Sequence, residues 1–598
     1  MKSTVLSRRD LDFLLFEWLR VDELTKRERF AEHSRDTFTG VLNLCEQVAT
    51  RYFAPHNKKG DAHEPSFDGT SVTLIPEVKA AWDAFAKAGL LSVSMDEALG
   101  GAQLPASVAA AGFAWFSAAN VSTAGYAMLT LANANLLARH GSREQVEAFV
   151  KPMLTGRFAG TMCLSETQAG SSLADIITRA EPRDDGTYRL FGSKMWISGG
   201  DHELTENIVH LVLAKIPGGP PGTKGISLFI VPKFLVDADG AVGQRNDVAL
   251  AGLNHKMGFR GITNTVLNFG EGRWQPGGEA GAVGHLVGEP HRGLSYMFHM
   301  MNEARLGVGM GAVALGYTGY LKSLQYARER PQGRPITAKD ATAPQIPIIG
   351  HPDVRRMLLT QKAFVEGAMA LGLYCGRLVD LARSAESDEE RDNAELLLDI
   401  LTPVVKSWPS QWCLHANDLA IQVHGGYGYT REYDVEQHYR DNRLNPIHEG
   451  THGIQSLDLL GRKVVQRGGA SLAALGSAIG QTVAEAAAAG GEPAQWAPQL
   501  NAAWQQLVSV TAALFGSRDI EAAMANSVIY LEAFGHIVIA WIWLEQLVAA
   551  QANRGDFYDG KRQAGRFFFR YELPKAATAL DLLETLDRTT LEMRDSWF

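Results

Sequence analysis

The spacing of apolar residues along the chain changes at about residues 160 and 285. Between these points the chain has short runs of β-branched and aromatic residues, bounded by glycine, proline and asparagine, at 207–216, 225–231 and 263–269. Such runs are typical of β-strands. On both sides, at about 35–158 and 293–462, apolar residues recur at helical spacing. The sequence therefore predicts a mainly α-helical protein with a central β domain.

The end of the chain predicts additional helices. The second helical region is interrupted by a proline-rich stretch at 331–352, and Gly468-Gly469 opens an alanine-rich segment with a polar break at 490–493. We expect an N-terminal helical domain with an N-terminal extension over residues 1–160 and a β domain over 161–285. A helical bundle over 286–465 and a further helical domain over 466–598 should follow.

Composition and charge argue against several classes of protein. The 598 residues carry a formal net charge of −9, which is mild for this length and gives no sign of nucleic-acid binding. Four separated cysteines without a CxxC pair predict reduced thiols in the cytoplasm. The N-terminus has acidic residues throughout and lacks a clean apolar stretch ending in small residues, so it does not resemble a signal peptide. Because the longest apolar run, near Ile537–Leu544, is about half of a membrane span, we expect no integral membrane segment.

Two interpretations compete over residues 445–455, NPIHEGTHGIQ. His448 and His452, with Glu449 between them, spell the zinc-protease motif, in which two histidines on one helical face bind the metal and the glutamate acts as a base. Gly450 and Gly453 each disfavour such a helix by about 1 kcal/mol, and no clear third ligand follows. We therefore expect no metal site and keep a zinc metallopeptidase as an alternative.

Four motifs in order favour a different site. The chain contains CLSE and AGS (163–171), GSKMWIS (192–198), QVHGGYGY (422–429) and RDNRL followed by IHEGTHGIQ (440–455), and Arg305 ends the segment MNEAR. In order and spacing these motifs resemble the acyl-CoA dehydrogenase family of flavoproteins, over roughly residues 40–465.

The length and two segments narrow this resemblance. YARERPQGR (326–334) and GIQSLDLLGRK (453–463) are most similar to the long subgroup that includes 3-methylmercaptopropionyl-CoA dehydrogenases. The resemblance implies an N-terminal helical domain, a middle β-barrel or sandwich, a C-terminal four-helix bundle and an extra C-terminal helical domain. It also implies a homo-oligomer, expected to be a dimer.

The resemblance implies FAD-dependent α,β-dehydrogenation of an acyl-CoA thioester, with electrons passed to an electron-transfer flavoprotein. Glu449 stands where the family has the base that takes the Cα proton while a hydride leaves Cβ for the flavin. Carbon acids are weak, so the base needs a dry site that raises its pKa. A minority of relatives place the base directly before the position of Arg305, where this chain has Ala304.

The same resemblance assigns the binding residues. Those expected to contact the flavin from the same subunit are Met162, Leu164, Ser165, Gly170, Ser171, Trp196 and Ser198. Those expected to contact the adenylate half, mostly from a neighbouring subunit, are Arg330, Gln422, Gly425, Gly426 and Thr451. Arg305, Ser171 and Gly450 are expected to bind the substrate. Two structural alternatives remain, that Glu449 only caps a helix and that Trp196 is a core residue.

Several positions depart from the family pattern. Thr167 and Ser172 stand where the family usually has Pro and Asp, and Gly333 replaces a flavin-contacting Phe. His448 and His452 replace Tyr and Asn or Ser beside the base, where a histidine would shift the pKa of Glu449 in a direction set by its own charge. A flavin-bearing binding protein without dehydrogenase activity is therefore a second alternative. The acyl chain is expected to be 3-methylmercaptopropionyl or of short to medium length.

A glycine pattern at Gly307, Gly309 and Gly311 partly matches a dinucleotide-binding fingerprint. It follows a helical segment rather than a strand, and no acidic residue stands at the required offset. We therefore expect these glycines to allow close packing between helices.

Overall fold

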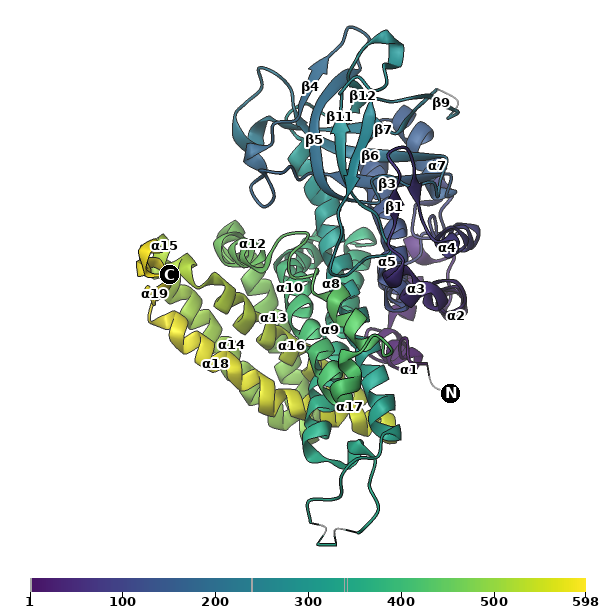
Figure 1. Cartoon of the computed structure of the whole chain (residues 1–598). Helices are drawn as coiled ribbons and strands as arrows, with labels where there is room; N and C mark the ends of the chain where they lie inside the picture. The colour runs from purple at the N-terminus through teal and green to yellow at the C-terminus, as the bar shows by residue number, and fades with distance from the viewer. Residues whose placement is uncertain (1–2, 238–239, 338, 341) are drawn as a thin grey trace. The chain divides into compact units, whose positions relative to one another are not determined.

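The computed structural model describes the whole chain except residues 1–2, 238–239, 338 and 341, and except the side chains at 299, 300 and 302 (Figure 1). Two compact units are formed. The helical unit consists of residues 1–38, 105–114 and 305–598, and the β unit of residues 39–104 and 115–304. Helices α5 (Ala106–His140) and α8 (Gly293–Glu329) each contribute to both. Most of the chain is helical and the named strands all lie in the β unit, which confirms the predicted fold class.

Eight strands form the main sheet in the described part of the β unit. Their order is β10 (Val248–Leu253), β11 (Asn264–Phe269), β5 (Tyr188–Ser198), β12 (Ala282–Leu286), β7 (Ile226–Pro232), β6 (Asn207–Lys215) and β3 (Phe158–Cys163), with β4 (Arg179–Pro182) beside β5 and β6. β3 and β6 run parallel, whereas the other neighbours in this order are antiparallel. The predicted strands at 207–216, 225–231 and 263–269 are confirmed as β6, β7 and β11.

β6 and β7 are buried along almost their whole length, because both faces of this part of the sheet are covered. In β6, Val209, Leu211 and Leu213 join an apolar cluster that includes residues of α5. The alternate residues Val212 and Ala214 join a second cluster on the opposite face. A strand buried on both faces has a continuous apolar sequence, and this explains the run in β6.

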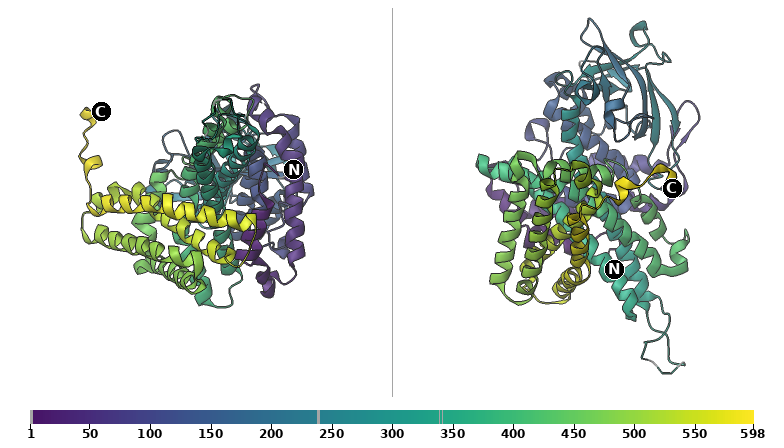
Figure 2. Two further views of the ribbon diagram at one scale, coloured as in Figure 1. Left: turned by 90° about the horizontal axis from the view of Figure 1, so that it is seen from below. Right: turned by 90° about the vertical axis from the view of Figure 1, so that its left-hand side faces the viewer.

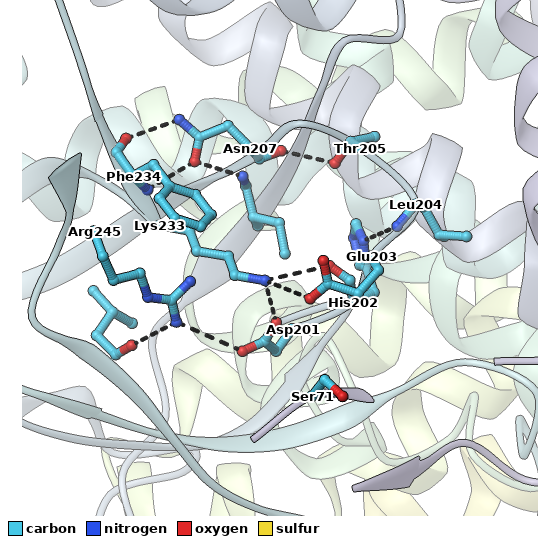
Figure 3. Close-up of polar contacts among 12 residues, drawn as sticks. Ser71, Asp201, His202, Glu203, Leu204, Thr205, Asn207, Lys233, Phe234 and Arg245 are labelled. Atoms are coloured by element: carbon cyan, nitrogen blue, oxygen red, sulfur yellow. Dashed lines mark hydrogen bonds and ion pairs between the residues drawn. The ribbon is translucent and has the colours of Figure 1, made fainter. Parts of the chain in front are cut away.

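Ion pairs of the buried Lys233 hold the loop 199–206, which directly follows β5 (Figure 3). The Lys233 ammonium, just before β8 (Phe234–Val236), donates to Asp201 Oδ1 at 2.7 Å and to Glu203 Oε1 at 3.1 Å. Arg245 lies 3.9 Å from the other Asp201 oxygen. The side chain of Asn207 hydrogen-bonds to the backbone at the start of β8. The end of β5 is therefore fixed to the strands that follow it.

Beyond α1 (Arg8–Asp12) and the start of α5, the described helical unit has three long helices and two short ones before its C-terminal part. They are α8, α9 (Pro352–Arg383), α10 (Asp388–His424), α11 (Val435–Asn442) and α12 (His452–Asp458). α9 packs along α10. α8 ends just before the proline-rich stretch, and α9 begins at Pro352, where proline suits a first helical turn.

The C-terminal helices are α13 (Gln466–Ala489), α14 (Gly491–Gly516), α16 (Ser527–Ala550), α17 (Asp556–Phe567) and α18 (Leu573–Glu584). α13, α14, α16 and α18 pack against one another (Figures 1 and 2). The backbone is left-handed at Gly468 and Gly469, and Gly490, with φ of 70°, separates α13 from α14. The breaks therefore lie where the sequence predicted them, and the extra helical domain is confirmed.

α16 requires a correction. By length and composition it is apolar enough to cross a membrane, with a mean hydropathy of 1.6, whereas the sequence analysis found no run of sufficient length. The difference arises because the apolar run at 537–544 is only the centre of a longer apolar helix. Of its membrane-like stretch, 83% is buried, and the helix packs against α13, α14, α17 and α18. α16 is therefore the core helix of the C-terminal part.

A buried group of charges joins the N-terminal extension to the rest of the helical unit. Lys561 Nζ, on α17, lies 2.5 Å from Asp10 Oδ1 and 3.0 Å from Glu366 Oε2. Tyr317 donates a further hydrogen bond to Asp10 at 2.9 Å. Removing one partner from such a group leaves an uncompensated buried charge, which is strongly destabilising. The first and last parts of the chain are thereby tied to the same helices.

α8 approaches the backbone of α10 closely at Gly309. Pro409 of α10 has no N–H, so the carbonyl of Val405, four residues earlier, receives no helical hydrogen bond. A Cβ on residue 309 would lie 1.9 Å from that oxygen, so only glycine allows this approach. Gly316 and Gly319 face later turns of α10. The predicted helix packing through small residues is confirmed at Gly309.

We predict opposite effects of alanine at two glycines of α8. Gly309→Ala should lower the free energy of unfolding by about 1–3 kcal/mol, because its Cβ would overlap the backbone of α10. Gly311→Ala, the matched control, would place its Cβ where no atom lies within 4 Å. It should stabilise the protein by up to about 1 kcal/mol through helix propensity. Thermal unfolding of the two variants measures the difference, and equal unfolding temperatures would contradict the packing argument.

Candidate functional site

The segment between α11 and α12 turns sharply at Glu449. Glu449 has φ of 53° and Gly450 has φ of 90°, so two successive residues are left-handed. This conformation costs about 1–2 kcal/mol for a residue with a side chain, and such strain concentrates at functional sites. Thr451 then caps α12 by accepting a hydrogen bond from Ile454 N at 3.3 Å. The predicted base therefore lies in a tight turn that the surrounding structure must hold.

Three hydrogen bonds to backbone carbonyls hold this turn. Lys406 Nζ donates to Asn445 O at 2.9 Å and to Gly450 O at 2.6 Å. Gln455 Nε2 donates to Glu449 O at 3.0 Å. Lys406 and Gln455 are both fully buried. Side chains from α10 and α12 thus fix the carbonyls on both sides of the Glu449 side chain.

The charges around Glu449 act in opposite directions on its carboxyl. Burial raises the pKa of Glu449, while the positive charges of Lys406 and Arg305 act to lower it. Arg305 Nη1, from α8, lies 3.0 Å from Asp458 Oδ2 of α12, and both side chains are buried. The net pKa of Glu449 is raised, and a carboxylate with a raised pKa is a stronger base.

The two histidines beside Glu449 are uncharged near neutral pH. Burial lowers the pKa of His448 to about 3 and that of His452 to about 4, and the charge of Lys406 adds to both shifts. His448 Nε2 lies 3.0 Å from Asn445 Oδ1, and His452 Nε2 lies 3.1 Å from Gln411 Oε1. Each imidazole therefore has its own neutral partner.

The geometry of the zinc motif is not formed. His448 lies in the turn outside any helix, whereas His452 is the first residue of α12. The two left-handed residues between them prevent the single helical face that the motif requires. Among the described residues, no group of three or more His, Cys, Asp or Glu side chains is placed to hold a metal ion.

The residues of the β unit predicted to contact a flavin lie at the end of β3, in the loop after it and at the end of β5: Met162, Leu164, Ser165, Gly170, Ser171, Trp196 and Ser198. The first three are partly buried, whereas the two loop residues at 170 and 171 are exposed. Ser198 Oγ accepts a hydrogen bond from Asn264 Nδ2 at 3.2 Å. These residues therefore lie at the C-terminal ends of β3 and β5 and in the loop after β3, and this loop contacts β5 through the hydrogen bond from Met195 N to Ser165 O.

Trp196 lies in a β-bulge. Lys194 of β5 pairs with Leu267 and Ile197 pairs with Thr265, so two residues of β5 oppose one residue of β11. Trp196 is one of these two, with φ of 66°, and it is 60% exposed. Bulges redirect side chains and are common beside active sites. The alternative that Trp196 is a core residue is therefore wrong.

One buried carboxylate organises the loop after β3. Glu166 accepts hydrogen bonds from Ile177 N at 2.8 Å, Thr178 Oγ1 at 2.6 Å and Lys194 Nζ at 2.9 Å. Lys194 also donates to Leu164 O at 3.0 Å. Burial alone would raise the pKa of Glu166, but Lys194 and these hydrogen bonds lower it to about 2. The carboxylate therefore stays ionised and keeps the loop in place.

The residues predicted to contact the adenylate half lie at the C-terminal end of α10 and beside it. Gln422 is in the last turn of α10, and Gly425, with φ of 61°, starts the exposed turn that follows. The Arg330 guanidinium lies over the ring of Tyr427, 5.6 Å from its centroid. The structure thus brings Arg330 next to the glycine turn, and Thr451 is the N-cap of α12.

Four residues that shape these sites were not assigned a role from the sequence: Glu166, Lys194, Lys406 and Gln455. Three of them stand inside the matched motifs, where their types were visible but their partners were not. Lys406 is different, since the only signal was a lone lysine in the apolar run TPVVKSWP. A buried lysine in such a run needs acceptors supplied by the fold.

Family profiles match four regions of the chain. They are the N-terminal domain (41–157), the middle domain (161–270) and the C-terminal domain (291–464) of acyl-CoA dehydrogenases, and an acetyl-CoA dehydrogenase C-terminal-like domain (475–594). These profiles together cover most of the chain.

Two similar proteins and one solved structure are also acyl-CoA dehydrogenases. The 3-methylmercaptopropionyl-CoA dehydrogenase of Ruegeria pomeroyi is 36% identical, over 90% of this chain and 89% of the relative. The broad-specificity linear acyl-CoA dehydrogenase FadE5 of Mycobacterium tuberculosis is 35% identical, over 99% of both. The acyl-CoA dehydrogenase of Bacillus anthracis complexed with FAD has the same fold, with a TM-score of 0.65 at 21% identity over 94% of this chain and 97% of that one. The chain belongs to the acyl-CoA dehydrogenase family, as an oxidoreductase that carries the additional C-terminal domain.

Proposed function

We propose that this acyl-CoA dehydrogenase uses FAD to oxidise a straight-chain acyl-CoA of short to medium length to the α,β-unsaturated thioester, with Glu449 as the base. The observation that carries the proposal is the state of Glu449. Its pKa is raised by burial, and its backbone is held in a left-handed turn by α10 and α12. A residue that only capped a helix would not need this support, and Thr451 already caps α12.

The residues of the β unit fit a flavin. Trp196 offers a large exposed ring, and the partly buried Met162 and Leu164 offer apolar surface. Ser165 and Ser198 supply hydroxyl groups for polar ring atoms. A Cβ at Gly170 would meet no atom within 4 Å, which is consistent with an open approach for a phosphate group. Members of the family bind FAD, and these features support the same cofactor here.

The proposed chemistry needs one proton transfer by the protein. Glu449, ionised, takes the proton from Cα of the thioester, and its raised pKa favours this transfer. The fixed backbone of the turn would also place the N–H of Glu449 to donate to the thioester carbonyl as negative charge develops there. Bound FAD supplies the acceptor for the hydride that leaves Cβ. Arg305, Ser171 and Gly450 remain the proposed contacts of the substrate.

The substrate class follows from the relatives. One is named for 3-methylmercaptopropionyl-CoA and another for linear acyl-CoAs. Both are unbranched acyl chains, since a thioether sulfur replaces one methylene in the first. We therefore propose an unbranched chain.

The family resemblance supports two further proposals, an electron-transfer flavoprotein as electron acceptor and a homodimer. In that dimer, Arg330, Gln422, Gly425 and Gly426 would bind the adenylate half of the partner's FAD.

Titration with substrates tests the proposal. The purified protein should be yellow, contain FAD and hold no stoichiometric zinc. Under anaerobic conditions, unbranched acyl-CoAs of graded length and 3-methylmercaptopropionyl-CoA should bleach the flavin, and a branched isomer of equal size should do so more slowly. A colourless protein with one zinc per chain would support a metallopeptidase. A yellow protein that no thioester bleaches would support a flavin-bearing binding protein.

Replacing the base should separate binding from chemistry. Glu449→Gln should retain FAD but lose reduction by acyl-CoA by at least about 100-fold, the lower range of general-base contributions. Glu303→Gln is the matched control, because Glu303 lies on α8 two positions before Arg305 and should not act as the base. Stopped-flow absorbance of the flavin measures both rates. Normal bleaching by Glu449→Gln would move the base elsewhere.

Replacing Lys194 should destabilise the loop after β3, which contains Glu166 and several of the proposed flavin contacts. Lys194→Met leaves Glu166 buried without its cation, so we expect a loss of about 3–5 kcal/mol in stability of the β unit and a lower FAD content. Arg183→Met, which breaks the exposed pair with Glu279, should cost no more than about 1 kcal/mol and leave FAD content unchanged. Thermal unfolding and the ratio of flavin to protein absorbance report both effects. A Lys194→Met variant with unchanged values would show that the pair does not organise the loop.

A further inference from the structure

Lys406 of α10 has an unusual set of partners for a buried lysine. Its ammonium donates to two neutral carbonyls, those of Asn445 and Gly450. Within the described chain, no carboxylate lies within ion-pair distance of it. A buried charge normally needs an opposite charge as well as hydrogen bonds. The charge of Lys406 is therefore not explained by the two hydrogen bonds alone.

The two carbonyls that Lys406 joins stand on either side of Glu449. Asn445 lies four residues before Glu449 and Gly450 directly after it. One ammonium therefore closes the turn, and the bond from Gln455 to the carbonyl of Glu449 completes it. Because Glu449 and Gly450 are both left-handed, the turn depends on such contacts to keep its shape.

The carboxylate that interacts with Lys406 is that of Glu449. Burial lowers the pKa of Lys406 to about 7, with the charge of Glu449 acting to raise it and that of Arg305 to lower it. In return, Lys406 opposes the effect of burial on the pKa of Glu449. The two groups stabilise each other in their charged forms.

The other groups that face this pair do not replace Lys406. Arg305, from α8, is already paired with Asp458. His448 in the turn and His452 of α12 have lowered pKa values, so both are neutral near pH 7. From α16, Glu532 lines a small pocket together with His452 and Ser407, the residue after Lys406. As a carboxyl group, Glu532 cannot supply the positive charge that Lys406 supplies. Lys406 is thus the cation beside Glu449 that has no other carboxylate partner among the described residues.

We propose that Lys406 is the positioning residue of the base, which closes the turn around Glu449 through two carbonyls and favours the ionised form of its carboxylate. This inference rests on the proposed role of Glu449. It requires two separable effects of Lys406, one of hydrogen bonding on the shape of the turn and one of charge on the proton affinity of Glu449.

Substitutions of Lys406 separate these effects. Lys406→Gln keeps a donor without the charge, and Lys406→Met removes both. With an acyl-CoA that bleaches the wild type, the pH at which flavin reduction is half-maximal should rise in Lys406→Gln, because the charge of Lys406 acts to lower the pKa of Glu449. We expect a rise of about one unit, the lower end of the effect of a nearby opposite charge on a carboxyl pKa. Lys406→Met should show the same shift and a further fall of at least tenfold in the maximal rate.

The control is Lys463→Gln. Lys463 is also buried in the helical unit, but it pairs with Asp399. This variant should lose stability without any shift of the pH midpoint. A Lys406→Gln variant that folds, retains FAD and has the wild-type midpoint would overturn the proposal, since a merely structural lysine would not move it.

A second measurement does not depend on whether the Lys406 variants fold or on turnover. Lysine side chains labelled with ¹³C at Cε can be titrated by NMR in the wild type and in Glu449→Gln. Ordinary lysines titrate near pH 10, so a lysine that titrates near neutrality is recognisable. Its midpoint should be lower in Glu449→Gln, because the carboxylate that favours its charge is gone. Lysine midpoints that are all unchanged in Glu449→Gln would overturn the proposal. If no acyl-CoA bleaches the wild type, the proposed function fails, while this titration still tests the coupling.

Discussion

A carboxylate that removes a proton from carbon must be dry enough to be basic and still able to ionise. In Glu449, the proposed base, the two demands meet in one turn. Burial raises the pKa of Glu449, and two cations, Lys406 and Arg305, keep the rise limited. The strained backbone at Glu449 and Gly450 is compatible with this position only because α10 and α12 supply donors to its carbonyls. Residues of α8, α10 and α12 therefore all act on Glu449, either on its charge or on the backbone of its turn.

Much of the architecture could be predicted from periodicity. The strand runs at 207–216 and 225–231 and the glycine breaks near 468 and 490 were readable, because each depends on neighbouring residues alone. The motifs also located Glu449 in a turn before a helix. The partners could not be predicted, because Lys406 is more than forty residues from Gly450 in sequence, and Lys194 of β5 is 28 residues from Glu166 in the loop after β3. The exposure of Trp196 depends on a bulge, which one extra residue in β5 creates and no composition reveals.

The additional segments at the two ends of the chain are parts of one structure. Asp10 of the N-terminal extension and Lys561 of α17 meet at Glu366 of α9 in a buried group of charges. Trp18 also donates to Glu545 of α16 at 2.9 Å. These contacts require both terminal segments. A relative that lacked one of the two segments would leave the charged groups of the other buried without partners.

The apolar character of α16 matters during synthesis of the protein on the ribosome. α13 and α14 leave the ribosome before α16, but α17 and α18, which also cover it, are made afterwards. While those last helices are being synthesised, part of the apolar surface of α16 has no helix packed against it. Nascent chains with such surfaces are prone to clump and are common clients of chaperones. The last helices thus complete the cover of α16.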